Sequence, residues 1–224
     1  MALPWEQERR TVAETARRME RLGLVTGTAG NVSLRLRDAE RRPLLAVTPS
    51  GFPYEEMSAG DVLVVDFDLE PVEGEGVPSS ESLMHVEIYR SRPDVGAVIH
   101  THPVFATVAA VAGLEIPPIL DEMTIYIGGT VRVSEYAAPG GQELAHRVRE
   151  ALGDRKAALI RNHGAVGVGK DLREALEVCL LTERAAQVFV YCSLLGKVGE
   201  IPAAVLEAQQ GIYRMRLEAA EPDG

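Results

Sequence analysis

Residues 95–103 read VGAVIHTHP, an apolar stretch that ends in two histidines spaced two apart. A short apolar run behind a Pro-Asp turn predicts a buried strand over Val95–His100. Because side chains alternate along a strand, His100 and His102 should point to the same face at its end. His163 also directly follows an apolar strand. Three neutral imidazoles with an open fourth position are typical of catalytic zinc. Hydrogen-bonded structural histidines are the alternative interpretation, because spacing alone does not bring His163 to the pair.

The two remaining histidines are expected to lie outside this site. Glu81 and His85 are four residues apart on a predicted helix, a spacing that ligand pairs can have. We nevertheless expect His85 to be separate from the metal. His146 lies in a charged helical stretch and is expected in solvent.

Helices and short strands alternate irregularly around this stretch, with glycine-containing turns between neighbouring strands. Ser80 is expected to cap the second helix, and the acidic stretch Glu70–Gly76 is expected to be a turn. This order favours an α/β sandwich with a mixed, largely antiparallel sheet. The predicted helices cover 6–22, 80–89, 142–152, 172–195 and 203–217, with another after Pro103. The predicted strands cover 32–36, 44–47, 62–67, 95–100, 130–133, 157–160 and 165–168.

Composition and charge narrow the class of protein. The 224 residues are 46% hydrophobic, which suits one domain over 1–224 with a loose tail from about 219. The formal net charge of −10 repels phosphate backbones, so we expect no nucleic-acid partner. With no apolar signal core and no run of roughly 20 apolar residues, we expect a cytoplasmic protein without a membrane partner. Cys179 and Cys192 would lie roughly 20 Å apart on one helix, too far apart for a disulfide.

Three short polar segments have the residues to hold an anion: 28–33, 48–51 and 78–81. Each offers hydroxyls, an amide side chain or free backbone N–H groups at a helix start or a glycine turn. Ordinary turns are the alternative for each segment. Glu81 opens a helix, where the helix dipole helps to keep a carboxylate ionised. The alternative is that Glu81 only interacts favourably with the helix dipole and has no catalytic role.

Together these segments resemble the class II aldolase and adducin family over about residues 6–216. The family fold is a three-layer α/β/α sandwich, usually assembled as a ring-shaped homotetramer with active sites between subunits, and the resemblance implies the same here. Five motifs occur in the family's order: Thr28-Ala29-Gly30-Asn31, Thr48-Pro49-Ser50-Gly51, Ser79-Ser80-Glu81, His100-Thr101-His102 and Asn162-His163-Gly164.

The resemblance also implies a role for each matching residue. The ligands of a Zn²⁺ ion would be His100, His102 and His163, and Glu81 would be the catalytic acid/base. Tyr213 looks like the tyrosine near the C terminus that reaches a neighbouring subunit's site and protonates the leaving aldehyde oxygen. The substrate phosphate would be surrounded by Asn31, Ser50, Gly51, Ser79 and Ser80, with Thr28 and Gly30 shaping the first loop.

The activity implied by the resemblance is that of a zinc-dependent lyase acting on a small phosphorylated sugar. It would cleave a phosphorylated ketose by retro-aldol chemistry, with zinc stabilising the enediolate. The family's second catalytic tyrosine is replaced here by Asp121 and Glu122, which leaves the aldehyde half of the substrate and its stereochemistry open. The alternatives are a decarboxylase or dehydratase on a related sugar phosphate or sugar-acid phosphate, an epimerase, or a non-catalytic adducin-like module. The intact histidines and Glu81 argue against the last.

Overall fold

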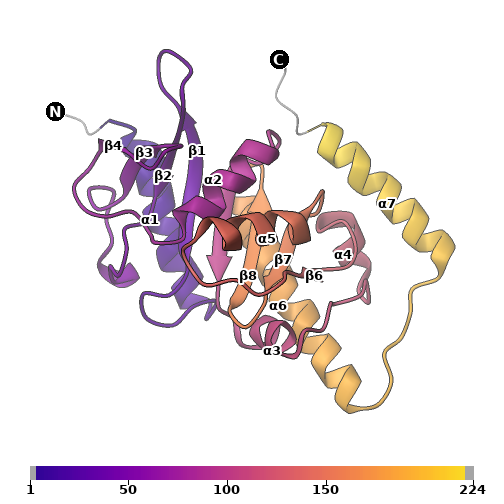
Figure 1. Cartoon of the computed structure of the whole chain (residues 1–224). Coiled ribbons are helices and arrows are strands. Elements are labelled where there is room, and N and C mark those ends of the chain that lie inside the picture. Colours follow the sequence, from indigo (N-terminus) through magenta and orange to yellow (C-terminus); the bar gives the residue numbers. More distant parts are fainter. Residues whose placement is uncertain (1–3, 220–224) are drawn as a thin grey trace.

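The computed structural model describes residues 4–219, which are built around one eight-stranded sheet in the order β4-β3-β2-β1-β5-β8-β7-β6 (Figure 1). Neighbouring strands are antiparallel except β6 and β7, which are parallel. The largely antiparallel sheet predicted from the sequence is therefore confirmed. The strands are β1 (Asn31–Arg37), β2 (Pro43–Val47), β3 (Leu63–Asp66), β4 (Pro71–Glu73), β5 (Ala97–Thr101), β6 (Arg132–Val133), β7 (Ala157–Ile160) and β8 (Gly164–Gly169).

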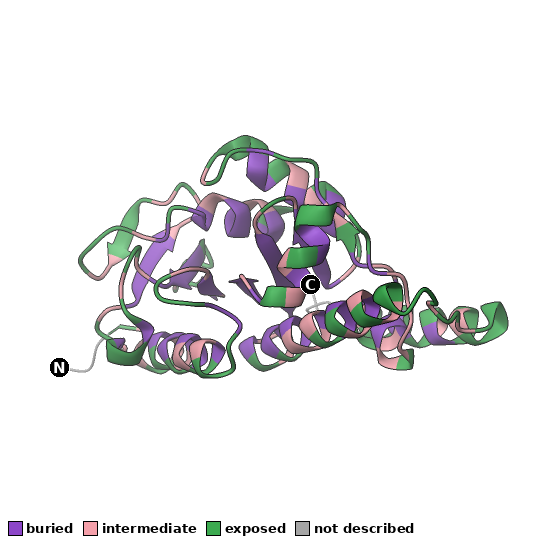
Figure 2. Cartoon of the chain, turned by 90° about the horizontal axis from the view of Figure 1, so that it is seen from below, coloured by how far each residue is buried: buried purple, intermediate pink, exposed green. Residues whose placement is uncertain are grey.

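Helices cover both faces of this sheet and complete the predicted α/β/α sandwich. α1 and α6 pack on one face, and α2 and α5 pack on the other. Figure 2 shows the strands almost wholly buried between helices whose outer surfaces are exposed. The helices are α1 (Glu6–Arg21), the 3-10 helix η1 (Tyr54–Glu56), α2 (Ser82–Ser91), α3 (Val104–Ala112), α4 (Asp121–Tyr126), α5 (Gln142–Leu152), α6 (Leu172–Leu194) and α7 (Ala203–Glu218).

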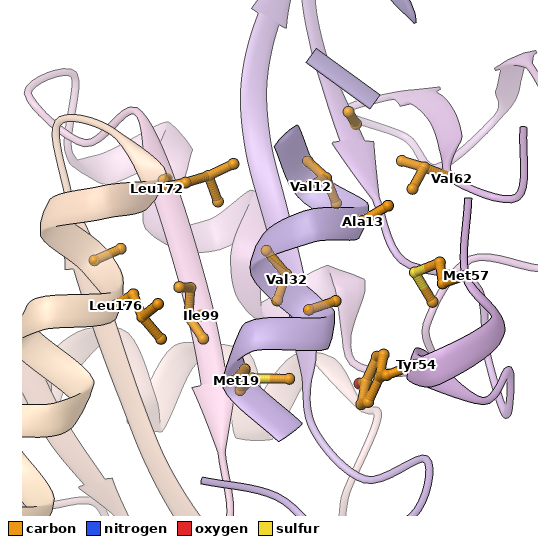
Figure 3. Packing of buried hydrophobic residues seen from close by; sticks show 14 of the residues in the cluster. Val12, Ala13, Met19, Val32, Tyr54, Met57, Val62, Ile99, Leu172 and Leu176 are labelled. Atoms are coloured by element: carbon orange, nitrogen blue, oxygen red, sulfur yellow. The ribbon is translucent and has the colours of Figure 1, made fainter. Parts of the chain in front are cut away.

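The alternation of side chains along β5 explains the two layers. Ile99 packs with α1 and α6, where Figure 3 shows it near Leu176. Val98, one residue earlier, packs with α2 and α5. His100 has the same parity as Val98 and therefore belongs to the α2 face. A strand that is buried on both faces thus ends in a histidine held beside the start of α2.

Two local predictions were wrong, and one short helix was not predicted. Glu70–Gly76 is not only a turn, because it contains β4, an edge strand paired to β3 through an irregular register. Its residues are mostly exposed, so they lack the apolar alternation that marks a strand. α2 begins at Ser82, with Glu81 at its N-cap and no capping side chain. Ser80 therefore does not cap it, because the chain still turns at Ser79, whose carbonyl accepts the Ser82 N–H. The six-residue helix α4 was not predicted.

The remaining expectations concern the chain ends, the cysteines and membranes. The loose tail expected from about 219 falls mainly on residues 220–224, outside the described residues. Cys179 and Cys192 are both free, as expected. Within residues 4–219, no helix has the length and apolar character needed to cross a membrane.

Candidate active site

Strand register brings the three predicted histidines together. β5 and β8 are antiparallel neighbours, with Thr101 opposite Ala165. The end of β5 therefore lies beside the start of β8, and the turn that joins β7 to β8 carries His163 to this place. Gly164 permits the approach, because a Cβ there would lie 2.3 Å from the Thr101 carbonyl oxygen. Glu81, at the N-cap of α2, completes the group from the helical layer.

Four side chains meet at this place, and we call them the metal cluster: Glu81, His100, His102 and His163. Each offers a donor atom, and these atoms all lie within 4.8 Å of one another. Glu81 Oε2 lies 2.9 Å from His100 Nε2, and Glu81 Oε1 lies 3.5 Å from His163 Nε2. The Nε2 atoms of His100 and His102 are 2.8 Å apart. The carboxylate is therefore a fourth possible donor beside the three imidazoles.

The donors of this cluster fit a divalent metal ion. His100 Nδ1 donates to the Ala165 carbonyl at 2.9 Å, which leaves the Nε2 lone pair directed at the cluster. Two imidazole lone pairs that face each other at 2.8 Å repel unless a proton or a cation lies between them. Glu81 Oε1 is buried and has no hydrogen-bond donor. Three imidazole nitrogens and one carboxylate form a ligand set that suits zinc.

Electrostatics keeps these donors in the forms that bind metal. Burial opposes ionisation of Glu81, but the hydrogen bond and charge of His100, with the other two histidines, lower its pKa to about 2. Burial and the charges of His100 and His163 lower the pKa of His102 to about 3. Burial and His100 also lower the pKa of His163. At neutral pH Glu81 is a carboxylate, and the imidazoles of His102 and His163 are neutral.

A polar cavity of about 230 Å³ adjoins the metal cluster. Its wall contains every residue predicted for the phosphate, together with Glu81, His102 and His163. Pro139, from the loop before α5, also lines it, and no sequence motif pointed to this residue. Asn31 and Ser79 are buried in the wall, whereas the other predicted residues are partly or fully exposed: Thr28, Gly30, Ser50, Gly51 and Ser80.

Backbone hydrogen bonds tie together the three segments that were predicted to hold an anion. The Thr48 N–H donates to the Val32 carbonyl, and the Ser79 N–H donates to the Thr48 carbonyl, both at 3.1 Å. The Ser50 N–H donates to the Val77 carbonyl at 2.9 Å. Segments that are distant in sequence thus form one fixed wall.

The first of these segments also contacts the metal cluster closely. Asn31 pairs with His100 in the sheet, and its Nδ2 donates to Ser79 Oγ at 2.8 Å. Gly30 has a left-handed φ of 74°, and a Cβ there would lie 2.5 Å from the His100 carbonyl oxygen. Glycine is needed at this position for both reasons.

An apolar hollow of about 640 Å³ adjoins the same two histidines. It is lined by His102 and His163 and by the outer face of α3, where Val104, Val108 and Val111 are 66%, 45% and 52% exposed. This surface could not be predicted from the sequence, because an apolar helix face does not reveal whether a neighbouring element covers it.

The other predicted residues lie elsewhere. His85 is buried and bonded to Ser33, outside the four-donor cluster, and His146 is exposed beside Glu150. Tyr213 is buried on α7, its ring over Gly128 and its hydroxyl donating to the Asp154 carbonyl at 2.6 Å. It is not among the residues that line the polar cavity.

Asp121 and Glu122 open α4, which packs against α7 at the rim of the molecule (Figure 1). Asp121 accepts a hydrogen bond from Gln209 at 2.7 Å, and Glu122 lies 3.9 Å from Arg184. Neither lines the polar cavity within the single chain.

Comparison with known proteins places this site in a family. Residues 10–190 match the model of the family described as Class II Aldolase and Adducin N-terminal domain. The chain is 36% identical over 216 residues to an L-fuculose phosphate aldolase of Escherichia coli, covering 93% of this chain and 96% of that protein. It is 35% identical over 199 residues to a 5-methylthioribulose-1-phosphate/5-deoxyribulose-1-phosphate aldolase of Rhodospirillum rubrum, covering 89% of this chain and 87% of that protein.

The fold agrees with these matches. A solved structure of an L-fuculose 1-phosphate aldolase superposes with a TM-score of 0.87 at 31% identity, covering 95% of this chain and 99% of that one. The chain therefore belongs to the class II aldolase and adducin family and is an enzyme of the class II aldolase type.

Proposed function

We propose that this enzyme is a zinc-dependent lyase that cleaves a ketose phosphate by retro-aldol chemistry. The observation that carries the proposal is the shared wall between the metal cluster and the polar cavity. A substrate phosphate in that cavity places the neighbouring carbons of a short sugar beside Glu81, His102 and His163. The relatives named above act on fuculose phosphate and on methylthioribulose or deoxyribulose phosphates, which supports a phosphorylated ketose here.

Neutral donors hold the phosphate in this proposal. Thr28, Ser50 and Ser80 are exposed residues of the cavity wall, while Asn31 and Ser79 form its buried part. Within residues 4–219, no lysine or arginine lines this cavity, so hydroxyls, an amide and backbone N–H groups hold the anion. This arrangement suits a chain with a net charge of −10, whose overall field does not attract anions.

His100, His102 and His163 would hold the metal ion, with Glu81 beside them. A bound ion would supply Lewis-acid stabilisation for the negative charge that develops on oxygen when the carbon–carbon bond breaks. Glu81 is the acid/base in the proposal, because its carboxylate is ionised and lies at the edge of the cavity. It takes a proton from the substrate hydroxyl during cleavage and returns a proton to carbon afterwards.

We also propose that the active unit is a homotetramer. The exposed valines of α3 adjoin His102 and His163, so a neighbouring subunit that covered them would shield the site from water. Tyr213 remains the proposed proton-transfer group at a neighbour's aldehyde oxygen, which it would protonate in the condensation direction, the reverse of cleavage. In the single chain its hydroxyl is engaged by the Asp154 carbonyl, so that role requires this bond to open.

The experiment is a screen of ketose 1-phosphates with the purified enzyme, with released dihydroxyacetone phosphate measured by a coupled assay. The proposal expects release with at least one of them, loss of release after chelation, and recovery with Zn²⁺. Sugar-acid phosphates are screened in parallel for carbon dioxide. Carbon dioxide without dihydroxyacetone phosphate would replace the aldolase with a decarboxylase, and no turnover with a bound metal would favour a binding module.

A further inference from the structure

Polar side chains form a line between α2 and β1, within a layer that is otherwise apolar. We call this line the polar seam. It consists of Asn31, Ser33 and Arg35 on β1 and of Glu81, His85 and Tyr89 on α2. One end of the seam is the metal cluster, through Glu81, and the other end is the C terminus of α2. Ser33 and His85, in the middle, are completely buried.

The repeats of the two elements match along the seam. Alternate residues of a strand are about 6.6 Å apart, and residues four apart on a helix are about 6 Å apart along its axis. Asn31, Ser33 and Arg35 therefore rise along the strand at nearly the spacing of the three α2 residues. The mismatch over the whole seam is only about 1 Å, so contacts can form along the length of the helix.

Hydrogen bonds join the two elements at three heights. At the start, Asn31 bonds Ser79, two residues before Glu81. In the middle, Ser33 Oγ lies 2.7 Å from His85 Nδ1 and 2.8 Å from the Tyr89 hydroxyl.

At the far end, Arg35 Nη2 donates to the carbonyl oxygens of Tyr89 and Arg92 at 2.6 and 2.8 Å. The Arg35 guanidinium also lies 4.8 Å from the centre of the Tyr89 ring. The far end thus holds the last turn of α2 but has no contact with the metal cluster.

The middle contact fixes the helix along its axis. Apolar packing alone tolerates a sliding helix, whereas a slip of one turn would move Glu81 by about 5.4 Å and leave Ser33 and His85 unpaired in the core. His85 lies one helical turn after Glu81, the donor that α2 carries to the metal cluster. Burial is the main reason that its pKa falls to about 3, so the ring is neutral and adds no charge to the site.

We propose that His85 is a positioning residue, which through its bond to Ser33 holds the first turns of α2 so that the Glu81 carboxylate stays against the three histidines. Its link to metal binding rests on the proposed function. His85 and the proposed ligands His100 and His102 thus have separate roles: two bind the ion, and one aligns the helix that carries the fourth donor.

The test compares variants of Ser33 with variants of the two residues that its hydroxyl contacts, His85 and Tyr89. Ser33→Ala removes both middle bonds, His85→Leu removes the ring nitrogens, and His85→Asn keeps a polar atom near the place of Nδ1. Tyr89→Phe is the matched control, because it removes the hydrogen bond between Ser33 and the Tyr89 hydroxyl and leaves the bond between Ser33 and His85. The measurements are the Zn²⁺ dissociation constant by competition with a chelator, and deuterium uptake of residues 82–89 in metal-free protein.

We expect Ser33→Ala and His85→Leu to weaken Zn²⁺ binding by roughly 10–100-fold, the usual effect of losing a group that orients a ligand. Deuterium uptake in the first turns of α2 should rise in both variants. His85→Asn should recover a large part of the affinity, and Tyr89→Phe should lower the melting temperature while leaving the affinity close to that of the parent. If His85→Leu does not fold, Ser33→Ala carries the test.

Unchanged affinity and exchange in Ser33→Ala would overturn the proposal, and so would an equal loss of affinity in Tyr89→Phe. A parent protein that binds no Zn²⁺ would defeat the proposed function instead. The deuterium uptake of Ser33→Ala against that of Tyr89→Phe would then decide whether His85 positions α2.

Discussion

Glu81 is the residue that joins the two halves of the site. Its carboxylate contacts His100 at 2.9 Å and also lines the polar cavity. A group in that place can serve as a metal donor or move a proton on the substrate, and its pKa of about 2 keeps it ionised, and therefore free to accept a proton, at neutral pH. The helix N terminus adds to the stability of this charge.

Glu81→Gln should lower kcat by roughly 10²–10⁴-fold, because an amide keeps the shape but cannot accept the proton. The melting temperature should change little. Glu87→Gln is the control, since Glu87 lies on the same helix and pairs with Arg149 outside the cavity. Steady-state kinetics of both variants make the comparison. Near-parent turnover in Glu81→Gln would reduce this residue to a partner of the helix dipole.

Single residues differ in how far the sequence could predict them. His100 and His102 followed from the alternation of one strand, which is local information. The approach of His163 depends on the register of β5 against β8, which spacing does not encode. Glu81 was expected to be an acid/base but not to lie within the metal cluster, because the position of α2 over the sheet is set by packing. Ser33 gave no separate signal, since a buried serine looks like any strand serine.

At the scale of elements, the loop before β1 lies tightly against the end of β5. Gly30 lies where a side chain would meet the His100 carbonyl, and it also has a left-handed φ. Gly27, three residues earlier, has a similar φ of 63°, but a Cβ there would meet nothing within 4 Å. Alanine substitutions at Gly27 and Gly30 therefore separate the cost of a left-handed φ in a residue with a Cβ from the cost of a steric clash.

Gly27→Ala should lower the free energy of unfolding by about 1–2 kcal/mol, the cost of a left-handed residue with a Cβ. Gly30→Ala should cost about 3 kcal/mol or more, because β1 must also move away from β5. Denaturant unfolding measures both. The close-approach account would be wrong if the two variants were equally stable.

Elements were predictable where periodicity was strong. Most helices, and strands such as β5, β7 and β8, lie near the predicted bounds because each buries an apolar face. β4 and α4 were missed, since a three-residue edge strand and a six-residue helix are too short to show a period. The polar seam could not be predicted from the sequence, because it depends on how α2 packs against β1.

At the scale of the whole molecule, stability should depend on pH through the buried His85. An unfolded histidine takes up a proton near pH 6.5, but the folded His85 does so only near pH 3. Between these values the unfolded state holds more protons, so the free energy of unfolding rises with pH.

In metal-free protein His85 should contribute a slope of up to about 1.4 kcal/mol per pH unit near pH 5. His85→Asn should remove that part of the slope. His102 and His163, whose pKa values are also lowered, change the stability in the same direction and remain in both proteins. Denaturant unfolding at several pH values gives the slopes, and parallel slopes for the two proteins would show that His85 is not held neutral.

Assembly is the second property at this scale. Light scattering should give four times the chain mass of 24.2 kDa, because the apolar face of α3 is left exposed in the single chain. Tyr213→Phe should then lower kcat without changing that mass. An active monomer contradicts the assembly, whereas a less stable tetramer with parent kcat would mean that Tyr213 only anchors α7 to Asp154.

The central claim is that His100, His102 and His163 hold a catalytic metal ion beside Glu81. The most direct measurement is the metal content of the purified enzyme by mass spectrometry, made on the same sample as the release of dihydroxyacetone phosphate. The prediction is one zinc ion per chain, with both metal and activity lost in His102→Ala and retained in His146→Ala, whose histidine is exposed on α5. A metal-free sample with full activity, or a His102→Ala variant as active as the parent, would contradict the claim.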